Sequence, residues 1–195
     1  MRKIALCILL IYVSIFAFAQ DTVVKTIQAI RVSYPPKIDG VLNDEVWKNA
    51  PIATDFIQDE PEYNKPSTQK TEVKILYDNN AVYIGAFMYD THPDSILHEL
   101  GSRDENGLNA DYFYVGFDTY NKSIDAYIFG TSASGIQIDF REQDGTYDAV
   151  WQSRTTINDK GWCVEFKIPY SAIRFPNSIL QTWKIEFERS IRRRR

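Results

Sequence analysis

Cysteine and histidine are scarce in this sequence, and each occurs twice among 195 residues. Cys7 lies in an apolar N-terminal run, so removal of that run leaves Cys163 without a partner, and no intramolecular disulfide is expected. His92 and His98 have no cysteine nearby and do not form a His-Glu-x-x-His pattern, which excludes the common zinc motifs. We therefore expect stability to come from packing, with or without a bound metal.

Positive charge is also limited. The chain has 22 Lys and Arg against 26 Asp and Glu, and six of the basic residues fall in the first three and last four positions. Binding to nucleic acid needs clustered positive charge, so the acidic body argues against a nucleic-acid partner. The same acidity is compatible with a bound divalent cation.

Motifs for catalysis are missing as well. The chain has no glycine-rich phosphate loop, and segment 130–135 fails as a nucleophile elbow because Ser134 stands where glycine is required. A glycosidase needs a defined pair of carboxyl groups, and no pair is marked out among the acidic residues. We expect that this domain is not an enzyme by itself and that segment 130–135 is a bend between two strands.

The long hydrophobic run of the chain is Ile4 to Ala19, which follows the basic Arg2 and Lys3. A basic start, an apolar centre and small residues before Gln20 are typical of a secretory signal peptide. The alternative is a membrane anchor, but the run is shorter than the roughly 20 residues of a spanning helix. We expect residues 1–19 to be a signal peptide, 20–36 a lead-in and 37–195 one domain. An exported chain would be periplasmic, outer-membrane-associated or extracellular, and the mature chain has no expected transmembrane helix.

Short runs rich in β-branched and aromatic residues alternate with turn residues such as Asp78-Asn79-Asn80. This pattern predicts an all-β fold, an antiparallel, jelly-roll-like β-sandwich. The expected strands are 53–58, 71–77, 81–89, 111–118, 124–131, 135–140, 149–157, 161–168 and 183–191. The polar segment from Thr91 to Ala110 is expected to be a long loop, and long loops often carry function.

Residues 37–51 predict a turn followed by a short N-terminal helix. Asp39-Gly40 is a tight turn, because glycine tolerates a positive φ. Asn43 is the expected N-cap, and Leu42 and Trp47 occupy the two positions of a hydrophobic staple. Pro51 ends the helix.

Alternation along the strands distinguishes the aromatic residues. Trp162 and Trp183 share faces with aliphatic residues and are expected in the core. Trp151 shares its side with Ala149 and Ser153, so it is the first candidate for an exposed platform that stacks on a sugar ring. Its expected partners are Tyr147, Gln152 and Arg154, and a second candidate face carries Tyr112 and Tyr114. The alternative is that these aromatic residues are ordinary strand residues.

Carboxylates gather around the long loop. Calcium prefers six to eight oxygen ligands, and Asp90, Asp94, Asp104 and Asp111 are candidates to supply them, together with Glu105. The alternative is a solvated acidic loop, since the Asp-x-Asp-x-Asp-Gly pattern of a calcium loop is absent.

Three stretches resemble the family 9 carbohydrate-binding module: KIDGVLNDEVWKNA, VKILYDNNAVYIGAFMYD and DYFYVGFDTYNKSIDAYIFGTSASGIQID. The closer match is to the variant at the N-terminus of large exported Bacteroidetes-type proteins whose remainder resembles an outer-membrane barrel. The resemblance implies a β-sandwich that binds a polysaccharide or oligosaccharide, often with structural calcium. It also implies a role in carbohydrate catabolism, next to a glycoside hydrolase or a barrel.

Sugar-binding members of that family place a stacking Trp three residues before the Asp that matches Asp111, where this chain has Leu108. Their second stacking Trp follows the strand that matches 183–191, beyond the last residue here. An alternative is therefore a structural or docking domain of an outer-membrane barrel protein that has lost sugar binding. Arg192 to Arg195 suggest either a basic tail or a chain that continues in a longer protein.

Overall fold

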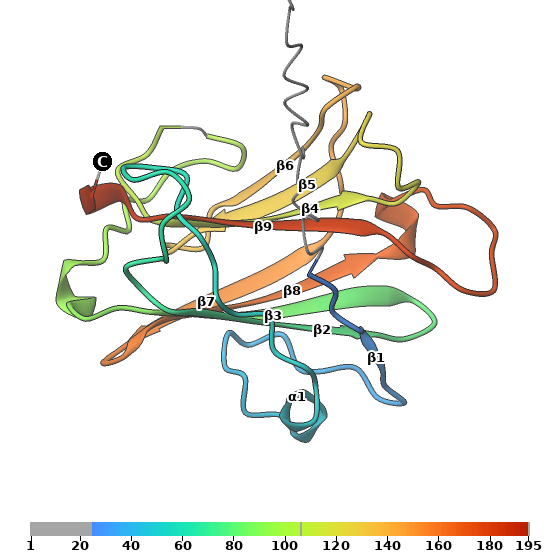
Figure 1. The fold of residues 1–195 in the computed structure, drawn as a ribbon, viewed down its shortest axis with the longest axis horizontal. Helices are drawn as coiled ribbons and strands as arrows, with labels where there is room; N and C mark the ends of the chain where they lie inside the picture. Colours follow the sequence, from blue (N-terminus) through green and yellow to red (C-terminus); the bar gives the residue numbers. More distant parts are fainter. Residues whose placement is uncertain (1–24, 106, 195) are drawn as a thin grey trace, which may run out of the picture.

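The computed structural model describes residues 25–105 and 107–194, and these form two β-sheets packed face to face (Figure 1). The expected signal peptide, residues 1–19, lies outside the described residues. One sheet has the strand order β1-β2-β3-β8-β7 and the other has the order β6-β5-β4-β9. The strands are β1 Ile30–Arg31, β2 Thr71–Tyr77, β3 Ala81–Tyr89, β4 Tyr112–Asp118, β5 Tyr127–Ser132, β6 Gln137–Arg141, β7 Gln152–Asn158, β8 Gly161–Pro169 and β9 Lys184–Ser190. The expected all-β sandwich is confirmed.

Within residues 25–105 and 107–194, helical structure is confined to short pieces. They are α1 Glu45–Lys48 and the 3-10 helices Pro93–Ser95, Tyr170–Ala172 and Arg192–Arg194. In the part of the chain that the structure describes, no helix combines the length and the apolar character needed to cross a bilayer.

The expected hairpins are present. The Asp78 carboxylate accepts hydrogen bonds from the backbone N–H groups of Asn80 and Ala81 at 2.7 and 2.9 Å, which fixes the turn between β2 and β3. The bend predicted over 130–135 is present only after Ser132, because residues 130–132 belong to β5; the Gly135 N–H donates to the Ser132 carbonyl at 2.9 Å. Local turn chemistry therefore sets these connections.

Two features near the N-terminus differ from the prediction. The strand predicted over 53–58 is wrong: Ala53 and Ile57 form isolated bridges, and Asp55 between them has a φ of 58° that interrupts an extended chain. The lead-in contributes β1, which runs parallel to β2 with Ile30 opposite Leu76. The sandwich is thus antiparallel except at the β1 edge.

The core lies between the two sheets. The inward residues of β8 were predicted correctly and are each fully buried: Trp162, Val164, Phe166 and Ile168. From β4, Phe113, Val115 and Phe117 pack against them. Trp183 is only partly buried, and its ring meets the Phe117 ring edge-on at a centroid distance of 5.8 Å. Each large side chain buried in this way contributes about 1.5–3 kcal/mol to the free energy of unfolding.

The outer face of the sheet that contains β8 is covered by residues 37–50, which we call the clasp (Figure 1). The buried Glu165 carboxylate organises it. One oxygen accepts the Trp47 indole N–H at 2.8 Å, and the other accepts the backbone N–H groups of Asp39 and Gly40 at 2.9 and 2.8 Å. Gly40 has the expected positive φ, at 84°. The predicted N-cap is off by one residue, since Asp44 occupies that position in place of Asn43.

Small residues beneath the clasp make room for its apolar side chains. A Cβ atom at Gly85 of β3 would lie 2.5 Å from Leu42 and 3.0 Å from Trp47, so only glycine accommodates both. Cys163 of β8 lies on the same outer face and is 2% exposed. Burial raises the pKa of its thiol to about 12. The clasp therefore gives this sheet a second, smaller core.

Candidate functional site

The outer face of the β6-β5-β4-β9 sheet is open and hollowed into a groove of about 540 Å³. We call it the outer groove. It is lined by Gly107, Leu108, Ala110, Tyr112, Tyr114, Gly116, Ile128, Phe140, Glu142, Glu186, Glu188, Ser190 and Arg192. Most of these residues alternate with core residues along their strands, so the pleat that buries Phe113 and Phe117 also turns Tyr112, Tyr114 and Gly116 outward.

The register of β4 and β5 explains why the face is hollow. Tyr114 lies opposite Gly130, and Gly116 lies opposite Ile128. A Cβ atom at Gly130 would lie 2.1 Å from Cδ1 of Tyr114, so the tyrosine ring rests directly over the glycine. At Gly116 a Cβ would lie 3.0 Å from Cδ1 of Ile128. These two glycines let neighbouring side chains lie down on the sheet.

The two tyrosines of the outer groove form a continuous aromatic surface. Their ring centroids are 5.8 Å apart and their planes differ by 16°. Tyr112 is 7% exposed, whereas Tyr114 is partly exposed. Burial raises the pKa of Tyr112, so its hydroxyl keeps its proton at neutral pH. The Tyr112 hydroxyl oxygen is buried near the Leu108 backbone. It forms no hydrogen bond of normal geometry with any described residue.

Carboxylates line the groove beside Tyr114 and further along it. Glu186 and Glu188 project from β9, opposite Gly116 and Tyr114 of β4, and Glu142 follows β6 at the other edge of the sheet. All three are exposed, and none forms an ion pair within residues 25–105 and 107–194. Arg192, at one end of the groove, is the basic residue among its lining. The groove is therefore negatively charged.

The prediction that Trp151 is an exposed platform is wrong. Trp151 is 5% exposed and its ring packs edge-on against Phe129 and Phe166, with centroids 5.3 and 5.0 Å away. Its indole N–H donates to Asp139 at 2.9 Å. The small residues beside it, Ala149 and Ser153, are themselves buried and leave space for the ring in the core.

The residues expected around Trp151 are dispersed. Tyr147 is partly buried, packs against Phe129, and donates its hydroxyl to the Ala172 carbonyl at 2.7 Å. Gln152 and Arg154 are exposed on β7, which belongs to the other sheet. Of the predicted sugar-site residues, the structure brings together Tyr112 and Tyr114.

The aspartates predicted to bind calcium mostly meet arginines. The Asp90 carboxylate is buried and pairs with Arg193 at 2.5 Å and with Arg189 at 3.7 Å. Burial opposes its ionisation, but the Arg193 and His92 hydrogen bonds outweigh burial and lower the pKa of Asp90. Asp111 is fully buried, accepts the Arg192 N–H at 2.9 Å, and has its pKa raised by burial.

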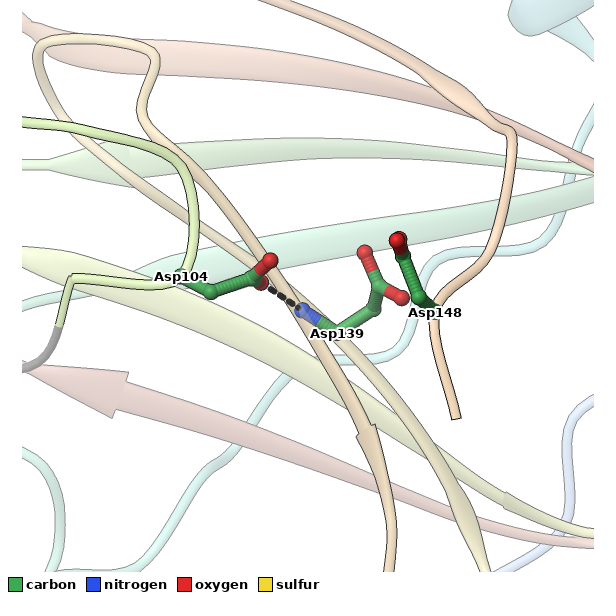
Figure 2. A group of neighbouring side chains, drawn as sticks. All are labelled: Asp104, Asp139 and Asp148. Carbon is green, nitrogen blue, oxygen red and sulfur yellow. Dashed lines mark hydrogen bonds between the residues drawn. The ribbon is translucent and has the colours of Figure 1, made fainter. Parts of the chain in front are cut away.

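Asp104 belongs to a different group that the sequence did not indicate. Figure 2 shows its carboxylate beside Asp139 and Asp148, and oxygens of the three lie within 4.8 Å of one another. Asp104 accepts the Asp139 N–H at 3.0 Å. The Arg103 guanidinium contacts all three carboxylates, and Asp139 also accepts the Ala149 N–H at 2.7 Å.

These contacts test whether calcium fits. Among the described residues, no group of three carboxylates close enough to share a metal includes Asp90, Asp94 or Asp111, and Asp94 is exposed in the Pro93–Ser95 turn. In the other group a guanidinium already supplies the positive charge. The residues present do not fit a calcium site of six to eight oxygens.

The chain is similar to known carbohydrate-binding proteins. A family model described as "Carbohydrate family 9 binding domain-like" matches residues 38–190. A family 9 carbohydrate-binding module from Caldicellulosiruptor kristjanssonii, in complex with cellotriose, is similar with a TM-score of 0.55 and 22% identity over 82% of this chain and 75% of that chain. A module of the same family and organism, in complex with glucose, has a TM-score of 0.56 and 22% identity over 82% and 76%. No curated protein matches the chain.

At this level of identity the two solved structures show a shared fold. The family match covers the clasp and every strand from β2 to β9. The resemblance to family 9 seen in the three sequence stretches is confirmed, and the chain belongs to the carbohydrate family 9 binding domain-like family.

Proposed function

We propose that this chain is a carbohydrate-binding module that holds a sugar chain in the outer groove. The observation that carries the proposal is the Tyr114 ring, which lies over Gly130 inside a groove lined by carboxylates that have no ion-pair partner in the described chain. A sugar ring presents an apolar C–H face that packs on an aromatic ring. Its hydroxyl groups need polar partners, and the groove offers both an aromatic ring and carboxylates.

The polar partners come from strands on either side of the tyrosines. Glu186 and Glu188 accept hydrogen bonds from sugar hydroxyls, and Arg192 donates to them. Hydrogen bonds to charged groups contribute about 1.5–3 kcal/mol each when water is excluded. The cellotriose and glucose complexes of the structural neighbours support a glucan or a related sugar as the ligand class.

Export and accessory action are part of the same proposal. An N-terminal signal peptide would carry the module to the periplasm, the outer membrane or the cell exterior, where polysaccharides are met. There the module would concentrate substrate for an attached or neighbouring glycoside hydrolase. It would take no part in bond cleavage itself.

A second candidate function is a docking domain for an outer-membrane barrel. Leu108, which stands where sugar-binding members of the family carry a stacking Trp, lines the outer groove and favours this reading. Co-purification of a barrel with the chain, unaffected by any glycan, supports docking. Displacement of the barrel by a glycan supports binding in the groove.

The test compares a groove variant with a matched control. Binding is measured by affinity electrophoresis against soluble polysaccharides and by calorimetry with cellotriose and glucose. Tyr114→Ala is expected to weaken binding about tenfold, or about 1.4 kcal/mol. Tyr63→Ala removes a tyrosine that is 79% exposed and outside the groove, and it is expected to bind normally. Equal binding by both variants, with thermal unfolding unchanged, would place the sugar elsewhere.

A further inference from the structure

The charge of the outer groove narrows the class of glycan that it accepts. Among the described residues that line it, Glu142, Glu186 and Glu188 carry negative charge and Arg192 carries positive charge. The lining therefore has an excess of negative charge before any ligand arrives. Carboxylates in a groove raise the local concentration of cations and repel anions.

The carboxylates are placed to act on a ligand that lies on the tyrosines. The sheet order β6-β5-β4-β9 puts β4 and its tyrosines between β9, which carries Glu186 and Glu188, and the end of β6, where Glu142 follows. Glu186 and Glu188 point to the same side of β9, about 7 Å apart along the strand. A chain of sugars crossing Tyr114 thus meets Glu188 and Glu186 on the β9 side, and it meets Glu142 only further along the groove, beyond the level of Phe117.

Neighbouring basic groups leave these carboxylates available. Lys184, the next outward residue of β9, donates to the Ser123 hydroxyl at 2.5 Å. Arg141, next to Glu142, pairs with Asp125 at 2.6 Å and lies 4.0 Å from Asp144. Arg192 sits at the Ser190 end of the groove, beyond Glu188 along the chain. Arg141 is thus neutralised by aspartates, Lys184 keeps its charge but is directed to Ser123, and Arg192 lies at the end of the groove.

We propose that the outer groove prefers glycans with free amino groups, such as glucosamine oligosaccharides, over neutral glycans, and rejects glycans built from uronic acids. This rests on the proposed function, because it assumes that a sugar chain lies on Tyr114. The ammonium group of each amino sugar pairs with a groove carboxylate, whereas a uronate carboxylate is repelled. Tyr114 stacks on the sugar ring of amino, neutral and uronic-acid glycans alike. The difference in affinity between these three classes comes from the carboxylates.

The experiment is calorimetry of the whole chain with four probes of equal length. They are a glucosamine trimer, its N-acetylated form, cellotriose and trigalacturonate, at mildly acidic pH and low salt. The glucosamine trimer is expected to bind about tenfold more tightly than cellotriose, with trigalacturonate the weakest. Salt at about 0.5 M is expected to remove most of this preference, since exposed charges are then screened within a few ångströms.

Two double variants locate the effect. Glu186→Gln/Glu188→Gln is expected to bring the affinities for the glucosamine trimer and cellotriose together. Cellotriose binding also weakens, because both carboxylates accept sugar hydroxyls, so the ratio of the two affinities is the quantity compared. Glu60→Gln/Glu62→Gln makes the same change in net charge at two exposed residues outside the groove and is expected to keep the preference.

The outcomes separate this inference from the proposed function. Cellotriose binding that depends on Tyr114, without tighter binding of the glucosamine trimer, overturns the preference and leaves the module's function intact. Loss of the preference in both double variants also overturns it, because the effect is then that of overall charge. Binding of no probe in a Tyr114-dependent way overturns both.

Discussion

The two sheets of this sandwich use their outer faces differently. The face outside β8 is covered by the clasp, and Glu165 on it is fully buried with three hydrogen-bond donors around one carboxylate. The face outside β4 and β9 carries Glu186 and Glu188, which are exposed and have no ion pair in the described chain. The same residue type is thus a structural acceptor on one face and an available group on the other.

The comparison teaches how to recognise a binding face in a sandwich of this kind. Burial of a carboxylate is costly unless donors surround it, so a buried and satisfied Glu belongs to the fold. Glu186 and Glu188, by contrast, are exposed and are free to meet a ligand that lies on Tyr114. Function is therefore expected on the open face, and stability on the covered one.

The largest expected effect is on the free energy of unfolding, which should fall far more when a core aromatic residue is removed than when a groove aromatic residue is removed. Trp151→Ala is expected to lower the free energy of unfolding by about 4 kcal/mol, because it removes a ring packed between the sheets and leaves a cavity. Tyr114→Ala, measured beside it by chemical denaturation, is expected to cost less than about 1 kcal/mol. Similar costs for the two variants would contradict the distinction.

The next effect concerns the covered face. Glu165→Ala is expected to destabilise the chain by about 3 kcal/mol, since the N–H groups of Trp47, Asp39 and Gly40 each lose a buried acceptor. The matched control is Glu186→Ala on the open face, which is expected to change stability by less than about 0.5 kcal/mol. Denaturant titration of both variants checks this, and a small effect at Glu165 would mean that the clasp contributes little.

Substitution of Gly130 tests whether the orientation of the Tyr114 ring on the open face matters for sugar binding. Gly130→Ala places a Cβ where the Tyr114 ring lies, so the ring has to tilt away and binding is expected to fall about tenfold, at a cost of about 1 kcal/mol in stability. Gly145→Ala adds a Cβ with no atom within 4 Å and serves as the control. Calorimetry with cellotriose reports the result; undiminished affinity would show that the ring orientation is unimportant.

The pH dependence of the covered carboxylate gives a smaller effect. Burial raises the pKa of Glu165 despite the hydrogen bonds that oppose the shift. The folded state then holds the proton more tightly than the unfolded chain, so this carboxyl adds stability below its unfolded pKa, and the contribution is lost as pH rises through the folded pKa. The stability of the wild type minus that of Glu165→Gln is expected to decrease from acid to neutral pH. If this difference in stability increased with pH instead, the pKa of Glu165 would be lowered by folding and the prediction would be contradicted.

The smallest expected effect is on calcium. Calcium or a chelator is expected to leave the thermal unfolding midpoint unchanged, because arginines already accompany the Asp90 and Asp139 carboxylates. Arg103→Ala is expected to make the midpoint rise with calcium, whereas Arg154→Ala, at an exposed site, is expected not to. A wild-type response to calcium would show that oxygen ligands gather despite the guanidinium.

Alternation and turn chemistry predicted much of the fold. They identified the inward residues of β8, the Asp78 turn and the positive φ of Gly40. They could not assign Trp151, because alternation shows which residues share a face and not what covers that face. The partner of its indole, Asp139, comes from another strand. Likewise β1 has two residues and no pattern, and its pairing depends on distant β2.

The groove was predictable in part. The sequence placed Tyr112 and Tyr114 on one face as a candidate sugar site, and both residues line the outer groove. That Gly130 lies opposite Tyr114 depends on the register of β4 and β5, which no local pattern specifies. The aspartates around the long loop were visible as a cluster in sequence, but Arg189 and Arg193, which meet Asp90, come from the far C-terminal end of the chain. The adjacent Arg103 meets Asp104 within the loop.

Because Cys163 lies buried beneath the clasp, the rate at which its thiol is labelled reports how often this face opens. With Cys7 replaced by Ser it is the single thiol of the chain, and reagents reach it only when residues 37–50 lift from β8. Its labelling rate, divided by that of an unfolded peptide, gives the equilibrium constant of that opening directly. The two faces of the sandwich can then be followed separately: ligand titration reports on the open face, and the labelling rate of Cys163 reports on the covered face.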